Sequence, residues 1–273
     1  MTLDTSAPSG TTSASVIPPT EADVARPAIV IDNVSKVFGH SGDAVQALDG
    51  VNLDIARGEF VCLLGASGCG KSTLLNIIAG LDGPTVGRVD VGGARTTLMF
   101  QEAALFPWLT ARGNVELPLK FAKVGKAERR DKADELLRLV NLGSFGDKRP
   151  HELSGGMRQR VALARALAQD VDILLMDEPF GALDAMTRDV LHDELERLWR
   201  ETDISIVFVT HNVREAVRLG DRVVLLSSRP GRVVHEFPVT IERPRRMDSA
   251  DVSALAATIT DELREEVRRH GGH

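Results

Sequence analysis

The stretch GASGCGKST, residues 65–73, constrains the fold more than any other feature of the sequence. It fits the pattern Gly-x-x-x-x-Gly-Lys-Ser, and it lies between the apolar run EFVCLL and the helix-forming run LLNIIAGL. Glycines in such a loop let backbone N–H groups approach phosphate oxygens. The lysine can then reach the β- and γ-phosphates, and the serine hydroxyl can ligate Mg²⁺. The order strand, loop, helix therefore predicts a nucleotide-binding P-loop.

Short apolar runs and amphipathic runs alternate along most of the chain. VDILLM, ISIVFVT and DRVVLLSS read as buried strands, and TRDVLHDELERLWRE and NVREAVRLG read as the helices between them. This alternation is typical of a mostly parallel sheet with helices on both faces. Residues 102–168 contain few strand patterns and several helical ones. The stretch 82–100 is short for a region with several strands. We expect it to pair as strands, and a shortened (clipped) hairpin is one arrangement that would fit.

Composition excludes several classes of protein. The net charge is −6 and the pI about 5.7, which argues against broad nucleic-acid binding because that needs a basic face. No apolar run is long enough to span a bilayer. Of the two cysteines, Cys62 lies in an apolar run and Cys69 lies in the glycine loop, so we expect no disulfide. Residues 1–27 are rich in Ser, Thr, Ala and Pro and are predicted to be a disordered tail, without the features of a secretory signal.

Carboxylates follow a second apolar strand in ILLMDEP, residues 173–179. Ligands of open α/β sheets bind at the carboxyl ends of strands, so these acids should face the nucleotide. We expect Asp177 to hold Mg²⁺ through water and Glu178 to orient and deprotonate the attacking water. His211, after the strand SIVFV, could contact the γ-phosphate or the water. Gln101, after TTLMF, could contact Mg²⁺ and water.

A second phosphate cradle is predicted at LSGGMRQR, residues 153–160, where Ser154 and two glycines precede a helix. Free N–H groups and the positive end of the helix dipole suit a phosphate there. A P-loop on an open surface leaves the γ-phosphate wet. A second helix N-terminus placed over it would exclude water and stabilise developing charge.

Taken together and in this order, the motifs resemble those of the nucleotide-binding subunits of ABC transporters. The resemblance covers about residues 28–242 and includes the Walker A loop, the Q-loop at Gln101, the signature, the Walker B strand, the D-loop GALDA and the switch histidine. It implies a P-loop NTPase with a RecA-like, mostly parallel core, an antiparallel β subdomain and an α-helical signature subdomain at about 102–168. Residues 243–273 form a C-terminal extension with an amphipathic helix.

The resemblance also implies roles for individual residues. Phe38 would stack on adenine, with core packing as the alternative. Asp184 and Ala182 would lie at the interface of a head-to-tail dimer. Phe106 and Trp108 would line a groove for a helix of the membrane subunit, with packing inside the helical subdomain as the alternative. Other residues implied to contact ATP, Mg²⁺ or the partner's nucleotide are Gly65, Ala66, Ser67, Gly68, Cys69, Gly70, Lys71, Ser72 and Thr73, then Leu153, Ser154, Gly155, Gly156 and Met157. The ligands of Mg²⁺ would be Ser72 from this set, Gln101 and Asp177.

The branch of the family is indicated by three longer stretches. FQEAALFPWLT, VTHNVREAVRLGDRVVLLSSRPGRV and ERPRRMDS are similar to the nitrate, sulfonate, taurine and bicarbonate importer group. This implies an ATPase on the cytoplasmic face of the membrane, a separate permease, and indirectly a solute-binding protein. The solute stays open among sulfonate, nitrate, taurine and a pyrimidine precursor. Another transporter branch, or a non-transport ABC ATPase, is the alternative. Remaining histidines, such as His151 and His192, read as surface or packing residues.

Overall fold

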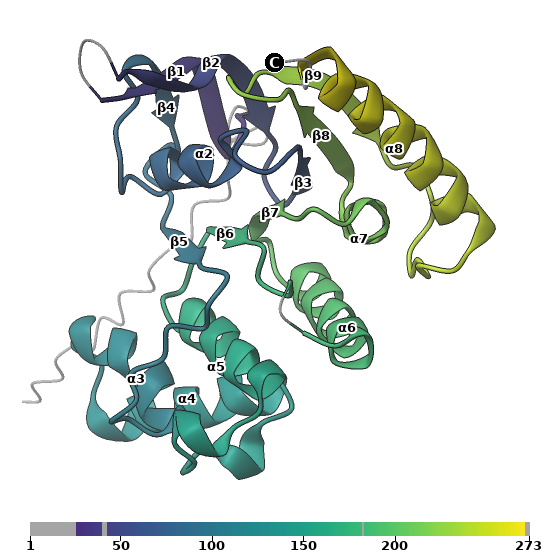
Figure 1. Cartoon of the computed structure of the whole chain (residues 1–273). Coiled ribbons are helices and arrows are strands. Elements are labelled where there is room, and N and C mark those ends of the chain that lie inside the picture. The colour runs from purple at the N-terminus through teal and green to yellow at the C-terminus, as the bar shows by residue number, and fades with distance from the viewer. Residues whose placement is uncertain (1–25, 40–42, 182, 271–273) are drawn as a thin grey trace, which may run out of the picture.

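A computed structural model describes residues 26–39, 43–181 and 183–270 (Figure 1). Nearly all of the predicted tail, and Ala182 of the D-loop, lie outside the described residues. The central layer is a six-stranded sheet in the order β5-β6-β7-β3-β8-β9. Five of its strands run parallel, and β9 pairs antiparallel with β8. The strands are β5 (Thr96–Met99), β6 (Ile173–Asp177), β7 (Ser205–Val209), β3 (Phe60–Leu64), β8 (Arg222–Leu226) and β9 (Val233–Pro238).

Alternate residues of the central strands pack into two separate hydrophobic cores. In β3, Val61 and Leu63 face the core formed with the antiparallel sheet and helix α2 (Lys71–Ile78). Phe60, Cys62 and Leu64 face the other core, which contains helices α5 (Gly155–Leu167), α6 (Ala185–Glu201) and α7 (Val213–Leu219). Side chains of a strand alternate between its two faces, so a strand with both faces covered must be apolar throughout. The continuous apolar runs of the sequence meet this need.

The smaller sheet is antiparallel and has the order β2-β1-β4, from β2 (Val45–Ile55), β1 (Ile29–Phe38) and β4 (Val86–Asp90). The predicted clipped hairpin is wrong. β4 pairs with β1, whereas β5 pairs in parallel with β6 of the other sheet. The stretch is short because residues 91–95 carry the chain from one sheet directly to the other. The predicted α/β fold with a mostly parallel core and an antiparallel subdomain is confirmed.

Helices α3 (Ala111–Phe121), α4 (Lys126–Leu139) and α5 form a group on one side of the molecule (Figure 1), with short 3-10 turns at Gly143–Phe145 and Pro150–Glu152. Thr110 caps α3 by accepting a hydrogen bond from the Gly113 N–H, as short hydroxyl side chains do at helix starts. Among the described residues, no helix is long and apolar enough to cross a membrane.

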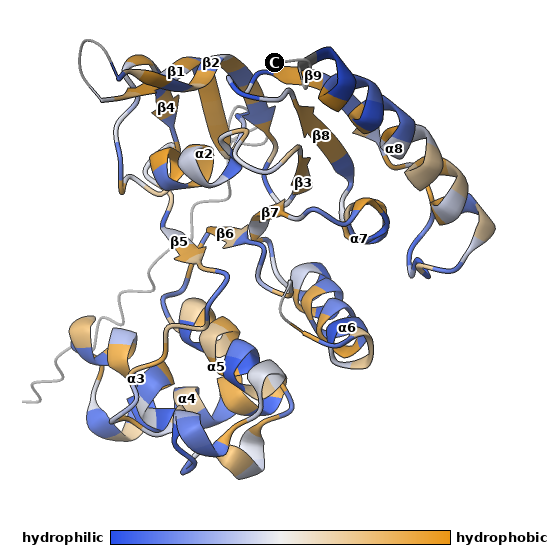
Figure 2. Ribbon diagram, in the orientation of Figure 1, coloured by the Kyte–Doolittle hydropathy of each residue, from blue (hydrophilic) through white to orange (hydrophobic). Residues whose placement is uncertain are grey.

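The chain ends in helix α8 (Ala250–His270), which packs against α7 through Val252, Ala256 and Ile259. Figure 2 shows that its C-terminal half is mostly hydrophilic. The preceding segment is held by Arg245, whose buried guanidinium donates hydrogen bonds to the carbonyls of Val217, Val239 and Ile241, among others. Burial lowers the pKa of Arg245 to about 10. These bonds join the C-terminal extension to the edge of the central sheet.

Candidate nucleotide-binding and hydrolysis site

The glycine loop connects β3 to α2 and can only be built with glycine at Gly70. This residue has φ +101°, and a Cβ atom there would lie 2.7 Å from the Ala47 carbonyl oxygen and from the Leu48 side chain. Lys71 begins helix α2 and is 7% exposed. Its Nζ donates to the carbonyl oxygens of Gly65 (2.9 Å) and Ala66 (3.0 Å). The ammonium group therefore lies across the loop that the sequence predicts to hold phosphates.

A pocket of about 360 Å³ opens over this loop. Phe38, 44% exposed, lies on its wall rather than in either core, with the Lys36 ammonium 5.0 Å from the ring centroid. Arg229 was not predicted; it also lines the pocket, and its Nε donates to the Gly68 carbonyl (3.2 Å). The full lining is Phe38, Val45, Ala47, Ser67, Gly68, Gly70, Lys71, Ser72, Thr73, Glu178 and Arg229.

Asp177 is the last residue of β6 and hydrogen-bonds to Ser72. Burial raises the pKa of its carboxyl and the negative charge of Glu178 adds to the rise, while the Ser72 bond and the Lys71 charge oppose it. A carboxylate and a hydroxyl side by side provide the hard oxygen ligands that Mg²⁺ prefers. Within the described parts of the chain, no three His, Cys, Asp or Glu side chains gather as a metal site. These residues therefore fit Mg²⁺ only together with nucleotide oxygens.

Glu178 and His211 are brought together at the same edge of the sheet. The Nδ1 atom of His211 lies 3.1 Å from Oε2 of Glu178, although the two residues are 33 apart in sequence. Glu178 has φ +45°, which is uncommon for a residue with a side chain and recurs at functional sites. Its side chain is 27% exposed and that of His211 is 67% exposed. Both groups therefore remain open to solvent and to a reactant.

Gln101 lies beside this pair. A Cβ atom built on Gly181 would be 3.7 Å from Nε2 of Gln101 and 3.8 Å from Oε2 of Glu178, so the two side chains converge on one glycine. The carbonyl of Gln101 accepts a hydrogen bond from Nε2 of Gln159 on helix α5 (2.6 Å). Gln159 was not singled out in the sequence, because only the fold shows that it reaches back to this segment.

The LSGG segment begins helix α5, where Ser154 is the N-cap and accepts a hydrogen bond from the Met157 N–H (3.2 Å). Gly156 must be glycine, because a Cβ atom there would lie 2.3 Å from Cγ2 of Thr187 on α6. Among the described residues, none of 153–157 lines the pocket over the P-loop. Figure 1 shows α2 beside β1, β2 and β4, whereas α5 lies with α3 and α4 in the helical group. One copy of the chain therefore has two separate cradles.

The three predicted interface residues lie in two places. Asp184 is the N-cap of α6 and accepts hydrogen bonds from the Thr187 N–H (3.0 Å) and hydroxyl (2.7 Å), which lower the pKa of its carboxyl. Phe106 lines a groove of about 360 Å³ between β5, α3 and α5. Trp108 contacts Phe106, with ring centroids 5.4 Å apart, but is 68% exposed and outside the groove's lining.

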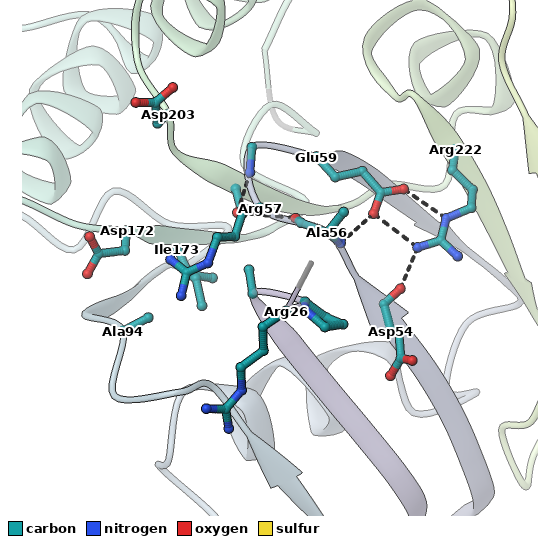
Figure 3. A pocket seen from close by; sticks show the side chains of 14 residues that line it. Arg26, Asp54, Ala56, Arg57, Glu59, Ala94, Asp172, Ile173, Asp203 and Arg222 are labelled. Carbon is teal, nitrogen blue, oxygen red and sulfur yellow. Dashed lines mark hydrogen bonds and ion pairs between the residues drawn. The ribbon is translucent and has the colours of Figure 1, made fainter. Parts of the chain in front are cut away.

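A larger cavity, of about 890 Å³, lies at the opposite edge of the central sheet, where β3, β6 and β7 begin (Figure 3). Its wall includes the ion pair between Arg222 and Glu59 (2.9 Å). None of residues 65–73 is in its lining. Its volume therefore does not mark the nucleotide site, because the phosphate-binding loop and both carboxylates lie at the other edge.

The fold and this site define a P-loop NTPase with a separate helical signature region. Residues 48–181 match the family described as ABC transporter. The nitrate import ATP-binding protein NrtD of Synechocystis sp. is 48% identical over 77% of this chain and 82% of its own. The taurine import ATP-binding protein TauB of Rhizobium johnstonii is 47% identical over 87% and 94%. The chain belongs to the ABC transporter family, and the predicted resemblance to this importer group is confirmed.

A solved structure supports the same assignment. The dimeric ATP-binding cassette MJ0796, in a post-hydrolysis state bound to ADP and Pi, aligns with a TM-score of 0.71 and 38% identity. The alignment covers 78% of this chain and all of the other. The protein is therefore an ABC ATPase of an importer system.

Asp177→Asn tests the electrostatics of the site. The pKa of Asp177 is higher in the folded state than in the unfolded state, because burial disfavours the charged carboxylate. The folded state is therefore most stable relative to the unfolded state below the unfolded pKa, where Asp177 is neutral in both states. This stability is lost as pH rises through the folded pKa. At pH 7 the Asn variant should therefore unfold in urea with a higher free energy than the nucleotide-free parent. The gain should shrink toward acid pH. Asp203→Asn, at an exposed carboxylate, is the control and should change little. An Asn variant less stable than the parent at pH 7 would contradict the burial argument.

Proposed function

We propose that this ATPase hydrolyses ATP with Glu178 as the general base, at the edge of the sheet where β3, β6 and β7 end. The observation that carries the proposal is the contact between Glu178 and His211 beside Asp177 and the P-loop lysine. Glu178 accepts the proton of the attacking water. His211 orients the carboxylate and contacts the γ-phosphate, and Gln101 contacts the water from the other side.

The P-loop binds the nucleotide before this step. N–H groups of residues 66–73 donate to the phosphates, and Lys71 exchanges its bonds with the loop carbonyls for bonds to the β- and γ-phosphates. Phe38 stacks on the adenine at the pocket wall. Ser72, Asp177 and Gln101 would hold Mg²⁺, which would neutralise phosphate charge. Arg229 stands close enough to the loop to add a positive charge near the phosphates.

The signature cradle serves the nucleotide of the second copy. Ser154 and the N–H groups of Gly155 and Gly156 cover the γ-phosphate held by the partner's P-loop, which excludes water and balances developing charge. Two-fold symmetry then gives two composite sites. Residues 153–157 are absent from the lining of the pocket over the P-loop, which supports a role for them toward a second copy.

The names of the relatives support a proposal for the transported solute and the partner proteins. We infer that the ATPase binds peripherally to a permease at the cytoplasmic face of the membrane and powers uptake of a small solute such as nitrate, a sulfonate or taurine. A solute-binding protein delivers the solute to the permease. The groove beside β5 is the surface proposed for a helix of the permease, since Phe100, Phe106 and Phe121 line it and are exposed.

Glu178→Gln should reduce kcat by ~10²–10⁴-fold and leave ATP binding intact, because the amide keeps the shape but cannot take a proton. Steady-state hydrolysis and equilibrium nucleotide binding are the two measurements. Glu102→Gln, at an exposed carboxylate one residue from Gln101, is the control and should keep the parental rate. If Glu178→Gln hydrolyses ATP within a few-fold of the parent, the base has been assigned to the wrong residue.

Composite sites predict complementation between two inactive chains. Lys71→Ala damages the P-loop. Gly155→Glu puts a negative charge at the signature, where the structure has room for a side chain and the Ser154 cap is retained. A heterodimer of the two has one site with both lesions and one with neither, so mixing should restore ATPase activity. Dimers shown by differential tags to have mixed, yet inactive, would argue for sites formed within one chain.

The groove predicts where the permease binds. Phe121→Ala should leave folding and ATP binding unchanged and weaken co-purification with the permease, because aromatic side chains in grooves carry much of an interface's binding energy. Trp108→Ala should weaken it too if the interface extends past Phe106. Phe145→Ala is the control, since Phe145 is also exposed but lies outside the groove. Full assembly and transport by Phe121→Ala would exclude the groove.

A further inference from the structure

His192 is the most buried histidine of the described chain and was expected only to pack. It lies on α6 with no solvent exposure. Both ring nitrogens have polar partners: Nε2 lies 2.6 Å from Oε1 of Glu215, and Nδ1 lies 3.0 Å from Nη1 of Arg218. An arginine can only donate, so Nδ1 must accept and the proton must lie on Nε2. In this arrangement, His192 donates from Nε2 to Glu215 and accepts at Nδ1 from Arg218.

The bonds continue from Glu215 to the backbone around His211. The hydroxyl of Thr210 donates to Oε2 of Glu215 and accepts from the N–H of Asn212 (3.0 Å). Thr210 and Asn212 are the two neighbours of His211 in the chain. The Thr210 N–H also donates to the carbonyl of Leu63 in β3 (3.3 Å). The imidazole of His211 is exposed, whereas the backbone on either side of it is held by the buried side chains of Thr210 and Glu215.

The other side of His192 contacts the loop that carries Glu178. The rings of His192 and Phe180 meet edge to face with centroids 5.6 Å apart, and Phe180 is itself buried. Phe180 is two residues after Glu178. One buried ring therefore touches both segments whose exposed side chains meet at the 3.1 Å contact between His211 and Glu178.

We propose that His192 is a positioning residue for ATP hydrolysis, which acts through Glu215 and Thr210 to hold His211 against Glu178. The inference rests on the roles proposed above for Glu178 and His211. Small displacements of a catalytic group lower the rate without changing substrate affinity, and ~1 Å can cost up to ~10²-fold. The bond from His192 to Glu215 is the part that matters for the rate, whereas the bond from Arg218 ties α6 to α7.

The two ring nitrogens can be tested separately. In His192→Gln the amide nitrogen can take the place of Nε2 and donate to Glu215. In His192→Asn the amide oxygen can take the place of Nδ1 and accept from Arg218, but nothing reaches Glu215. We expect kcat of His192→Asn to fall by about tenfold, because His211 is no longer held in place. KM for ATP should stay within about twofold, because the binding of ATP is not affected. His192→Gln should stay within about threefold of the parent.

Thr210 supplies a second matched pair, in case changes at the buried His192 impair folding. Thr210→Val has almost the shape of threonine but lacks the hydroxyl between Glu215 and Asn212, and Thr210→Ser keeps it. The valine variant should lose kcat as His192→Asn does, and the serine variant should not. Equal losses within each pair would show that packing alone is responsible and would overturn the proposal.

A double-mutant cycle separates this proposal from the assignment on which it rests. In a His211→Ala background, His192→Asn should cause no further loss of single-turnover rate, since the group that it positions is gone. A full additional loss would overturn the proposal. If His211→Ala itself hydrolyses ATP at the parental rate, the role of His211 fails instead. Nitrogen NMR of the histidine rings in the intact ATPase gives a readout without turnover: a ring protonated on Nδ1 would contradict the network directly.

Discussion

The parallel register of three strands is the constraint on which the site depends. Val209, the last residue of β7, lies opposite Leu63 of β3 on one side and opposite Asp177 of β6 on the other. The chain therefore leaves all three strands at the same level, and the P-loop, Glu178 and His211 emerge together. A slip of one residue would turn the apolar side chains of a strand toward the wrong core. The two hydrophobic cores and the hydrolysis site are thus specified by the same pairing.

The sequence predicted those parts of the site that are local in the chain. Gly70, Lys71, Asp177 and Glu178 were identified because each directly follows an apolar strand or begins a helix, and strand ends meet at one edge of a parallel sheet. The fold class followed from the same alternation. The clipped hairpin was wrong for a related reason: β4 and β5 are short strands of five and four residues that lie close in the chain, and only the whole fold shows that each pairs in a different sheet.

Residues that act over long separations could not be predicted. His192 is 23 residues from Glu215, and no motif or spacing distinguishes a histidine that donates to a buried carboxylate from one that packs or faces solvent. Arg229 is 161 residues from the loop carbonyl that it contacts, and Gln159 is 58 from Gln101. Each of these contacts depends on which helix covers which strand. Pairs of residues that vary together among related sequences could have indicated these contacts, and a single sequence contains no such pairs.

Helix α5 connects the LSGG segment to Gln101 and to the groove beside β5. The LSGG cradle forms its first turn, Gln159 one turn later holds the Gln101 carbonyl, and Arg165 donates to the carbonyls of Ala103 and Ala104. Arg165 also lines the groove proposed for the permease. All three sets of contacts belong to one continuous helix of 13 residues. Under the proposed composite site, a displacement of its N-terminus by the partner's γ-phosphate would move the Gln101 segment and the groove together, which would couple closure of the dimer to movement of the permease.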